Sequence, residues 1–342
     1  MAEATLTSLA ESNATPPLQS AVPAAVPAPL DVSILVVTWN SAPWIERCLA
    51  SIGPACIGLT HEIVICDNAS ADDTLDRVGE GKNVIRSQRN DGYAAATNRA
   101  FSRSEGQYVF LLNPDCELGA GTVTALHRFL EANARAAAAA PLLEDERGDS
   151  QREFQLRKLP TLGSLVAEVF SLGRFFPALT ARYRYRNLDI SRPQRVEQPA
   201  GAALLIRREV FEAVGPFDER FRPAWFEDVD YCRRLAAAGK EIWTVPTPPV
   251  RHFGGSSLET LSFAEFQSAW YRNMLRYARK WLGPVRTEIL RVMIIISMVL
   301  RSTASLLGLA HRHMKRVPAF RAYANVIGKA LKRWDDSSQS SS

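Results

Sequence analysis

The first part of the chain alternates between short apolar runs and segments with helical spacing. The run at 32–40, VSILVVTWN, is continuous and rich in β-branched residues, which is typical of a strand buried on both faces of a parallel sheet. The segment 41–52 has helical spacing, with Ser41 as a candidate N-cap and Pro43 in the first turn. A second apolar run at 61–70 predicts another strand. This pattern predicts strands that alternate with helices.

The alternation continues to about residue 118 and is less regular afterwards. The next predicted elements are a helix at 72–78, a strand at 83–90, a helix at 92–104 and an apolar strand at 107–118. An Ala-rich run at 134–140 predicts a helix, and 198–215 predicts a strand that turns into a helix. Elements in this order form an α/β sheet connected by right-handed crossovers.

Polar clusters follow four of the predicted strands. They lie at 38–40, 67–70, 90–92 and 113–115. In α/β sheets, ligands bind outside the carboxyl ends of the strands. We therefore expect these four clusters to border one cleft.

Two aspartates at these strand ends are candidate ligand-binding residues. A carboxylate at Asp67 can accept hydrogen bonds from the ring or the sugar of a nucleotide, although an Asp-Asn-x-Ser capping turn is an alternative. Asp115 ends the segment Asn113-Pro114-Asp115, where a carboxylate suits a divalent cation that also binds a diphosphate. The same tripeptide is also a common turn.

Further along the chain, acidic residues and a histidine stand among aromatic residues. Glu227, Asp228 and Asp230 lie within four residues, and repulsion between adjacent carboxylates shifts their pKa values in a way that suits a general base. The alternative is an acidic helix start, which the helix dipole favours. His252 in VRHFGGSS has the best site context of the five histidines, against the alternative of a packing residue.

Composition and missing motifs exclude several classes of protein. With 342 residues, 46% apolar and 23% charged, the chain is neither a disulfide mini-protein, nor a disordered polyelectrolyte, nor a polytopic membrane protein. Its five cysteines form no C-x-x-C pair, which indicates reduced thiols in a cytosolic protein. No G-x-G-x-x-G or G-x-S-x-G motif is present, which counts against a dinucleotide oxidoreductase and an α/β-hydrolase.

Residues 1–30 are rich in Ala and Pro without Lys or Arg, so we expect a disordered arm and no secretory signal.

Taken in order, the motifs resemble those of family 2 glycosyltransferases, in particular the rhamnosyltransferase-like branch. They are VSILVVTWN, VICDNASADDT, RNDGYAAATNRAF, VFLLNPD, GAALLIRREVFEAVGPFDERF, FEDVDYCRR and a late His-x-Gly-Gly. The resemblance implies a GT-A fold, with a mixed, mostly parallel sheet flanked by helices. It also implies a nucleotide-binding half at 31–118, an acceptor and catalytic half at 119–270, and a C-terminal helical tail at 271–342.

The resemblance further implies roles for individual residues. The nucleotide sugar would be bound by Thr38, Asn40, Asp67, Asn68, Asn90, Gly92, Asn98 and Asn113. Asp115 and His252 would bind Mg²⁺ or Mn²⁺, and Asp228 would be the catalytic base, with Glu227 as the second choice. Asn113 replaces the first Asp of the family's Asp-x-Asp motif, which leaves fewer protein ligands for the metal.

The expected activity is an inverting, metal-assisted transfer of a sugar from a nucleoside diphosphate to a hydroxyl group. Rhamnose on deoxythymidine diphosphate is the first expectation for the donor, with uridine-diphosphate sugars next. A cell-envelope glycan or lipid-linked molecule is the expected acceptor. One alternative is a sugar-phosphate nucleotidyltransferase, but TWNSAPW stands where that class has a Gly-rich loop. The other alternative is a catalytically silent carbohydrate- or membrane-binding relative. The joint presence of Asp67, Asp115, Asp228 and His252 argues against it.

The C-terminal part of the chain is strongly basic. Residues 272–334 contain fourteen Lys or Arg against one acid, Glu288, while the rest of the chain is net negative, so we expect no nucleic-acid partner. On a continuous helix, one arc of about 140° would hold the basic residues Arg286, Arg291, Arg301, Arg312, Lys315 and Arg316. This pattern predicts a helix on an anionic membrane surface, hence a cytoplasmic protein peripheral to the inner face of the membrane. A helix that docks on the enzyme or a second subunit is the alternative, and the oligomeric state stays open.

Overall fold

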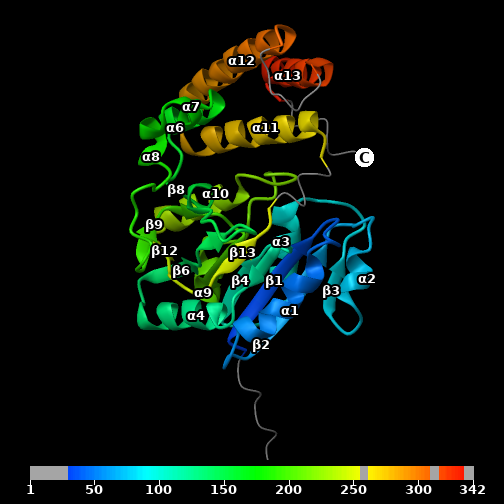
Figure 1. Ribbon diagram of the computed structural model, residues 1–342, viewed down its shortest axis with the longest axis vertical. Helices are drawn as coiled ribbons and strands as arrows, with labels where there is room; N and C mark the ends of the chain where they lie inside the picture. Colours follow the sequence, from blue (N-terminus) through cyan, green and yellow to red (C-terminus); the bar gives the residue numbers. More distant parts are fainter. Residues whose placement is uncertain (1–29, 255–260, 309–315, 335–342) are drawn as a thin grey trace, which may run out of the picture.

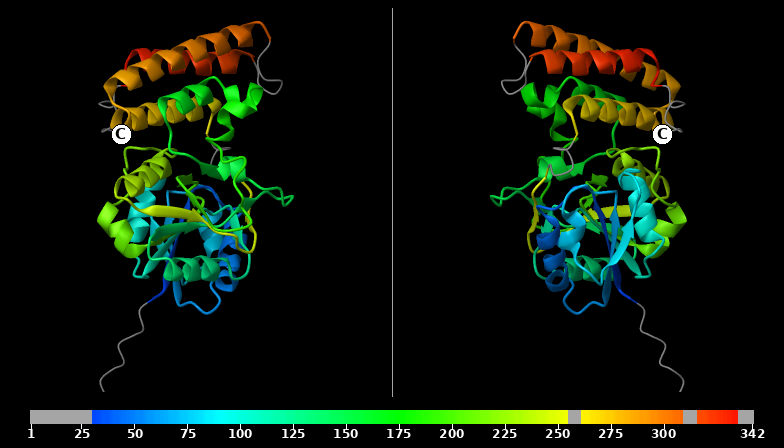
Figure 2. Two further views of the ribbon diagram at one scale, coloured as in Figure 1. Left: turned by 90° about the vertical axis from the view of Figure 1, so that its left-hand side faces the viewer. Right: turned by 90° about the vertical axis from the view of Figure 1, so that its right-hand side faces the viewer.

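The computed structural model describes residues 30–254, 261–308 and 316–334 (Figure 1). The arm predicted at 1–30 lies outside the described residues except for Leu30. A sheet with helices on both faces forms one part of the molecule, and three long helices form a cap at one end (Figures 1 and 2). All five cysteines are buried free thiols, in keeping with the absence of a disulfide framework.

The central sheet is mixed and has eight strands in the order β3-β2-β1-β4-β11-β6-β12-β9. These strands are β1 (Val32–Thr38), β2 (His61–Asp67), β3 (Asn83–Arg86), β4 (Tyr108–Leu112), β6 (Ala136–Ala140), β9 (Gln194–Val196), β11 (Ala203–Arg207) and β12 (Glu241–Thr244). Strands β1 to β4 are parallel, and β11 is antiparallel to β4 and β6. The parallel strands that were predicted from continuous apolar runs are thus present.

Two small sheets lie beside the carboxyl ends of the central strands. The first contains β5 (Cys116–Leu118), β7 (Leu143–Glu144) and β13 (Val250–His252), and the second contains β8 (Leu156–Arg157) and β10 (Gln198–Pro199). Strand β13 is antiparallel to β5, and His252 is opposite Cys116 in the register. This pairing brings two segments that are far apart in sequence to the same edge of the fold.

Helices cover both faces of the central sheet because the side chains of each buried strand alternate between two cores. The helices of this part are α1 (Ile45–Ala55), α2 (Thr74–Val78), α3 (Tyr93–Phe101), α4 (Thr122–Ala132), α9 (Arg208–Val214) and α10 (Glu227–Ala237). On β1, Ile34 packs in the core beneath α1 and α4, whereas Leu35 packs in the core beneath α3, α9 and α10. Both cores are apolar, which is the arrangement expected for strands buried on both faces.

The helix predicted from the Ala-rich run at 134–140 is wrong, because these residues form β6 in the middle of the sheet. All five residues of β6 are buried between β11 and β12. Alanine favours a helix intrinsically, but this preference is weak and burial within a sheet overrides it. The small methyl side chains pack in the cores on both faces of the sheet.

Four shorter helices connect the sheet to the cap. They are α5 (Arg152–Gln155), α6 (Leu162–Val169), α7 (Leu172–Phe175) and α8 (Pro177–Ala181). The cap itself consists of α11 (Phe263–Trp281), α12 (Pro284–Leu306) and α13 (Arg316–Leu331). A third core holds the cap together and includes Leu165 of α6, Met274 of α11 and Ile294 of α12.

The continuous basic helix predicted for the tail is wrong. Helix α12 ends at Leu306, and the next helix, α13, begins only at Arg316; Arg312 and Lys315 lie outside the described residues. Arg301 points toward α6 and α7, where it donates to the Val169 carbonyl oxygen at 3.0 Å and to the Ser171 hydroxyl at 2.9 Å. Part of the expected basic face therefore holds the cap to α6 and α7. The boundary that was expected at 270/271, between the catalytic half and the tail, falls inside α11.

Candidate active site

A cavity of about 670 Å³ opens at the carboxyl ends of the central strands and extends beneath α11. Seven of the twelve predicted site residues line it: Asn68, Asn90, Asn113, Asp115, Glu227, Asp228 and His252. They come from the ends of β2, β4 and β13, the loop before α3, and the start of α10. Side chains that are distant in sequence thus share one concave site of the size typical of ligand pockets.

The other five predicted residues, Thr38, Asn40, Asp67, Gly92 and Asn98, do not line this cavity in the described part of the chain. The buried Asp67 carboxylate accepts from the Thr38 hydroxyl at 2.8 Å and from the Ser70 backbone N–H at 2.9 Å. Asn98 donates to the Phe217 carbonyl oxygen at 3.0 Å. These contacts hold the strand-end loops in place, so a role of these residues in nucleotide binding stays a prediction.

Gly92 has a positive φ of 95° and lies directly against another loop. A Cβ atom at this position would lie 2.7 Å from the Pro223 carbonyl oxygen. The next residue, Tyr93, donates its backbone N–H to the same oxygen at 2.8 Å. Glycine is therefore required here by close backbone approach, and the approach connects the start of α3 with the loop before α10.

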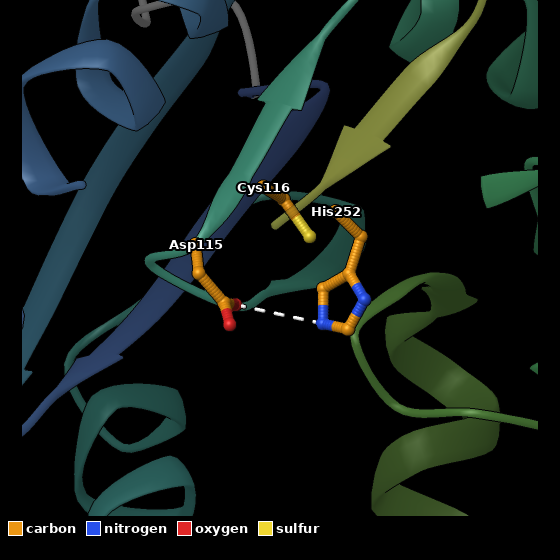
Figure 3. A group of neighbouring side chains, drawn as sticks. All are labelled: Asp115, Cys116 and His252. Atoms are coloured by element: carbon orange, nitrogen blue, oxygen red, sulfur yellow. Dashed lines mark ion pairs between the residues drawn. The ribbon is translucent and has the colours of Figure 1, made fainter. Parts of the chain in front are cut away.

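Asp115 and His252 form a compact buried pair at one wall of the cavity (Figure 3). His252 Nε2 lies 3.6 Å from Asp115 Oδ1. On its other side, His252 Nδ1 is 2.8 Å from Gln151 Oε1, while Gln151 Nε2 donates to the His252 carbonyl oxygen at 2.7 Å. Because the Gln151 amide is oriented by that second bond, Nδ1 carries the proton and the Nε2 lone pair points toward Asp115.

This pair fits a divalent cation. A metal-ligating histidine usually donates its second ring N–H to an oxygen acceptor, and Gln151 supplies that acceptor here. The ligand atoms of Asp115, Cys116 and His252 lie within 4.8 Å of one another. Cys116 is the poorer candidate, because Mg²⁺ and Mn²⁺ prefer oxygen ligands and because its thiol donates to the Ala202 carbonyl oxygen at 3.5 Å.

Glu227 and Asp228 begin α10 and face the same cavity. Burial raises the pKa of Asp228, although two backbone N–H groups, from Gly201 at 3.2 Å and Val229 at 2.8 Å, favour its charged form. Burial, with a contribution from the Asp228 charge, raises the pKa of Glu227 further above its ordinary value. Two backbone N–H groups stabilise the Asp228 carboxylate, whereas Glu227 Oε2 has no hydrogen-bond partner among the described residues, and this difference favours Asp228 as the proton acceptor.

The backbone just before these carboxylates is strained. Trp225 and Phe226 have φ values of 74° and 71°, the left-handed region that side chains other than glycine seldom adopt. Such conformations persist only where surrounding contacts enforce them, and they cluster at functional sites. The contacts that enforce the left-handed backbone of Trp225 and Phe226 come from α11.

Asn273 of α11 is fully buried and holds this strained segment. Its side-chain N–H₂ lies 2.9 Å from the Ala224 carbonyl oxygen, 3.1 Å from that of Trp225 and 3.3 Å from that of Arg222. Lys280 and Trp281 at the end of α11 contact the Asp230 carboxylate of α10. Residues of the expected tail thus hold the segment that leads into Glu227 and Asp228, a support that the sequence analysis did not predict.

We expect Asn273→Leu to lower kcat much more than it changes KM for the donor. The substitution keeps the branched shape and the number of side-chain heavy atoms but leaves buried carbonyl oxygens without a donor, which costs about 1–3 kcal/mol of folding stability. Steady-state kinetics and thermal unfolding measure the two effects. Asn325→Leu on the exposed side of α13 is the matched control, and equal behaviour of the two variants would contradict the positioning role.

The far end of the cavity is aromatic and apolar. It is lined by Trp225, Phe226, Phe266, Trp270 and Met274. The Trp225 and Trp270 rings are in edge contact at a centroid distance of 6.2 Å. The cavity therefore combines polar walls, which carry the candidate cation site and the two carboxylates of α10, with an apolar wall from α11 and the loop before α10.

Comparison with known proteins identifies the family. The model for "Glycosyl transferase family 2" matches residues 33–215, more than half of the chain. The chain belongs to this family. The glycosyltransferase resemblance and the activity class expected from the sequence are thereby confirmed.

Two relatives of this family 2 glycosyltransferase are rhamnosyltransferases. The N-acetylglucosaminyl-diphospho-decaprenol L-rhamnosyltransferase of Mycobacterium tuberculosis is 30% identical over 290 residues, which cover 75% of this chain and 92% of the relative. Rhamnosyltransferase WbbL of Escherichia coli is 26% identical over 188 residues, covering 54% of this chain and 67% of that protein. The rhamnosyltransferase-like character expected from the motifs is confirmed.

Solved structures confirm the GT-A fold of this family 2 enzyme. GalNAc-T7 with UDP, GalNAc and Mn²⁺ superposes with a TM-score of 0.53 at 17% identity, covering 90% of this chain and 57% of that chain. The mannosyltransferase PcManGT from Pyrobaculum calidifontis, in complex with GDP-Man and Mn²⁺, gives a TM-score of 0.52 at 16% identity. The match covers 91% of this chain and 89% of that chain. At this level of identity the likeness concerns the fold alone.

Proposed function

We propose that this glycosyltransferase transfers a sugar with inversion from a nucleoside diphosphate to an acceptor hydroxyl group in the cavity described above. The observation that carries the proposal is the shared cavity, which is lined by both the Asp115–His252 pair and the Glu227–Asp228 pair. A single displacement needs a group that stabilises the leaving diphosphate and a base that accepts the acceptor's proton. Asp115 and His252 supply the group that stabilises the diphosphate, and Glu227 and Asp228 supply the base.

The residues would act as follows. The acceptor oxygen attacks the anomeric carbon from the side opposite the diphosphate, while the Asp228 carboxylate accepts the proton of the hydroxyl group. The bond between the anomeric carbon and the diphosphate oxygen breaks, and its electron pair leaves with the nucleoside diphosphate. Asp115 and His252 would hold Mg²⁺ or Mn²⁺, which neutralises charge on a diphosphate when bound. Gln151 keeps His252 in the tautomer that exposes Nε2.

We propose an activated rhamnose as the donor and a diphosphate-linked lipid as the acceptor. Two relatives are named as rhamnosyltransferases, one of them acting on an N-acetylglucosaminyl-diphospho-decaprenol. The apolar end of the cavity, with Trp270 and Met274, suits the lipid-proximal part of such an acceptor. This assignment places the enzyme in the synthesis of cell-envelope glycans.

A donor panel tests this function. The purified chain is incubated with deoxythymidine-, uridine- and guanosine-diphosphate sugars, with and without Mn²⁺, and release of the nucleoside diphosphate is followed. The account expects metal-dependent release from deoxythymidine-diphosphate rhamnose above all others. In a parallel incubation, formation of a nucleotide sugar from a sugar phosphate and a nucleoside triphosphate, with release of pyrophosphate, would indicate a nucleotidyltransferase. A complete lack of donor turnover would indicate a silent relative.

We also propose that the cap rests on a membrane through the outer face of α12, whose composition and length would also suffice to cross one. Among the described residues, sixteen large apolar side chains are exposed, and fourteen of them lie on or beside α7, α8, α12 and α13. On α12 they form one stripe: Val285, Ile289, Val292, Ile296, Val299, Leu300, Leu306 and Leu307. Figures 1 and 2 show α12 and α13 outermost at one end of the molecule.

Charge complements this apolar face. Exposed Arg174, Arg182, Arg286 and Arg321 lie on or beside the same helices, and Glu288 is the one acid among the described residues of α7, α8, α12 and α13. Apolar side chains flanked by cations suit a surface of anionic phospholipids. The proposed membrane contact is therefore made by the apolar stripe, which includes Ile289, Ile296, Leu300 and Leu307 opposite the predicted basic arc.

Vesicle flotation tests this surface with two matched variants. Leu300 is 57% exposed on the stripe, and Ile57 is 62% exposed on the sheet part of the molecule. Leu300→Asp is expected to weaken binding to phosphatidylglycerol vesicles at least about tenfold, because burying a leucine contributes about 1.5–3 kcal/mol. Ile57→Asp should bind like the wild type. A dimer that Leu300→Asp dissociates, without any effect on flotation, would show that a second copy covers the stripe.

A further inference from the structure

A second cavity lies where the three cap helices meet, and it shares no described lining residue with the catalytic cavity. Its volume is about 350 Å³, within the range of ligand pockets. Seven of its ten lining residues are Arg or Lys, and no Asp or Glu lines it within the described ranges. We call this cavity the basic pocket. Six of its cations come from the cap: Arg272, Arg276, Arg279, Lys280, Arg291 and Arg333.

The spacing of these residues concentrates positive charge on one side of α11. Arg272, Arg276 and Arg279 are four and three residues apart, so they share one face of the helix, where like charges repel. Burial, together with the positive charge of Arg272, also lowers the pKa of neighbouring Lys329 on α13. A bound anion would relieve this repulsion.

Carboxylates near the pocket contact only some of its cations. Asp218 binds Arg220 and Lys280, and Glu288 binds Arg291. In contrast, the guanidinium groups of Arg279 and Arg333 form no hydrogen bond or ion pair with any described residue. Both arginines are exposed, so they can reach a ligand without giving up a structural contact.

Two buried donors in the pocket wall point to the same kind of ligand. Within the described residues, Arg291 Nε and Trp334 Nε1 have no hydrogen-bond acceptor, and both atoms are shielded from solvent. Buried N–H groups without an acceptor are rare because they lose their hydration without compensation. A ligand with several oxygen atoms would satisfy them.

We propose that the basic pocket binds a phosphate-bearing anion, either the head group of a phospholipid or a free phosphate or diphosphate. Arginine forks bind the paired oxygens of phosphate in two-point contacts, and several arginines converge here. The pocket borders the start of α12 through Thr287 and Arg291, on the side of the helix turned away from the apolar stripe. A phospholipid head group and a free phosphate would offer its arginines the same phosphate oxygens. This proposal does not depend on the catalytic function.

Pyrophosphate binding to the full chain tests the proposal in metal-free buffer. The wild type is expected to bind pyrophosphate in calorimetry and to unfold at a higher temperature in its presence. The double variant Arg279→Gln/Arg333→Gln should bind at least about tenfold more weakly. The control Arg103→Gln/Arg128→Gln removes the same charge from exposed arginines of the sheet part and should keep its affinity.

Vesicles distinguish the two sources of phosphate. If the double variant of the pocket also loses more binding to phosphatidylglycerol vesicles than the control does, the ligand is a lipid head group. If it loses only pyrophosphate binding, the ligand is a free phosphate. Equal pyrophosphate and vesicle binding of pocket variant and control would overturn the proposal. Lack of donor turnover alongside normal pyrophosphate binding would count against the catalytic function alone.

Discussion

Asp228→Asn is expected to lower the rate of glycosyl transfer by about 10²–10⁴-fold while the affinity for the nucleotide sugar stays within about twofold. The amide cannot accept the proton of the acceptor hydroxyl group, yet it keeps the size of the carboxylate. Transfer is measured by release of the nucleoside diphosphate, and donor affinity is measured by calorimetry in the presence of Mn²⁺.

The pH dependence gives a second readout of the same residue. Because burial raises the pKa of Asp228, the base becomes protonated at a higher pH than an ordinary aspartate. Activity should therefore fall on the acidic side as the pH drops through this raised pKa. Near-normal turnover of Asp228→Asn would contradict the assignment, and a large loss in Glu227→Gln alone would favour the second carboxylate.

Asp115→Ala is expected to weaken Mn²⁺ binding in the nucleotide complex by more than about 100-fold. Loss of a residue that only orients a metal ligand costs about 10–100-fold in metal affinity, and loss of a ligand should cost more. Gln151→Leu removes the acceptor of His252 Nδ1 and should fall in that lower range. Titration of Mn²⁺ by electron paramagnetic resonance measures both variants.

The control for these variants is Asp149→Ala, which removes an exposed carboxylate two residues from Gln151. It should bind Mn²⁺ like the wild type. If Asp115→Ala and Asp149→Ala gave the same titration, the cation would bind elsewhere.

The sheet and much of the cavity were predictable because their signals are local. Buried parallel strands leave continuous apolar runs, and the residues after them, such as Asn68 and Asp115, reach the cavity by the geometry of the sheet alone. Strand β6 was not predictable in this way, since five alanines have the same pattern in a helix and in a central strand.

The supporting residues could not be found from the sequence because their partners are remote. Gln151 contacts His252 across 101 positions, and Asn273 holds Trp225 across 48. Neither residue stands in a recognisable motif. The same limit explains the tail: a helical wheel shows that α12 has two faces, but only the packed structure shows that Arg301 reaches Val169.

The central claim is that one cation lies between Asp115, His252 and a bound diphosphate, close to Asp228. Crystals grown with Mn²⁺ and deoxythymidine diphosphate test it through the anomalous signal of manganese. The account predicts one strong peak within coordination distance of Asp115 and His252 Nε2, in contact with the diphosphate. A diphosphate bound in the cavity with manganese elsewhere, or with no manganese peak, would contradict it.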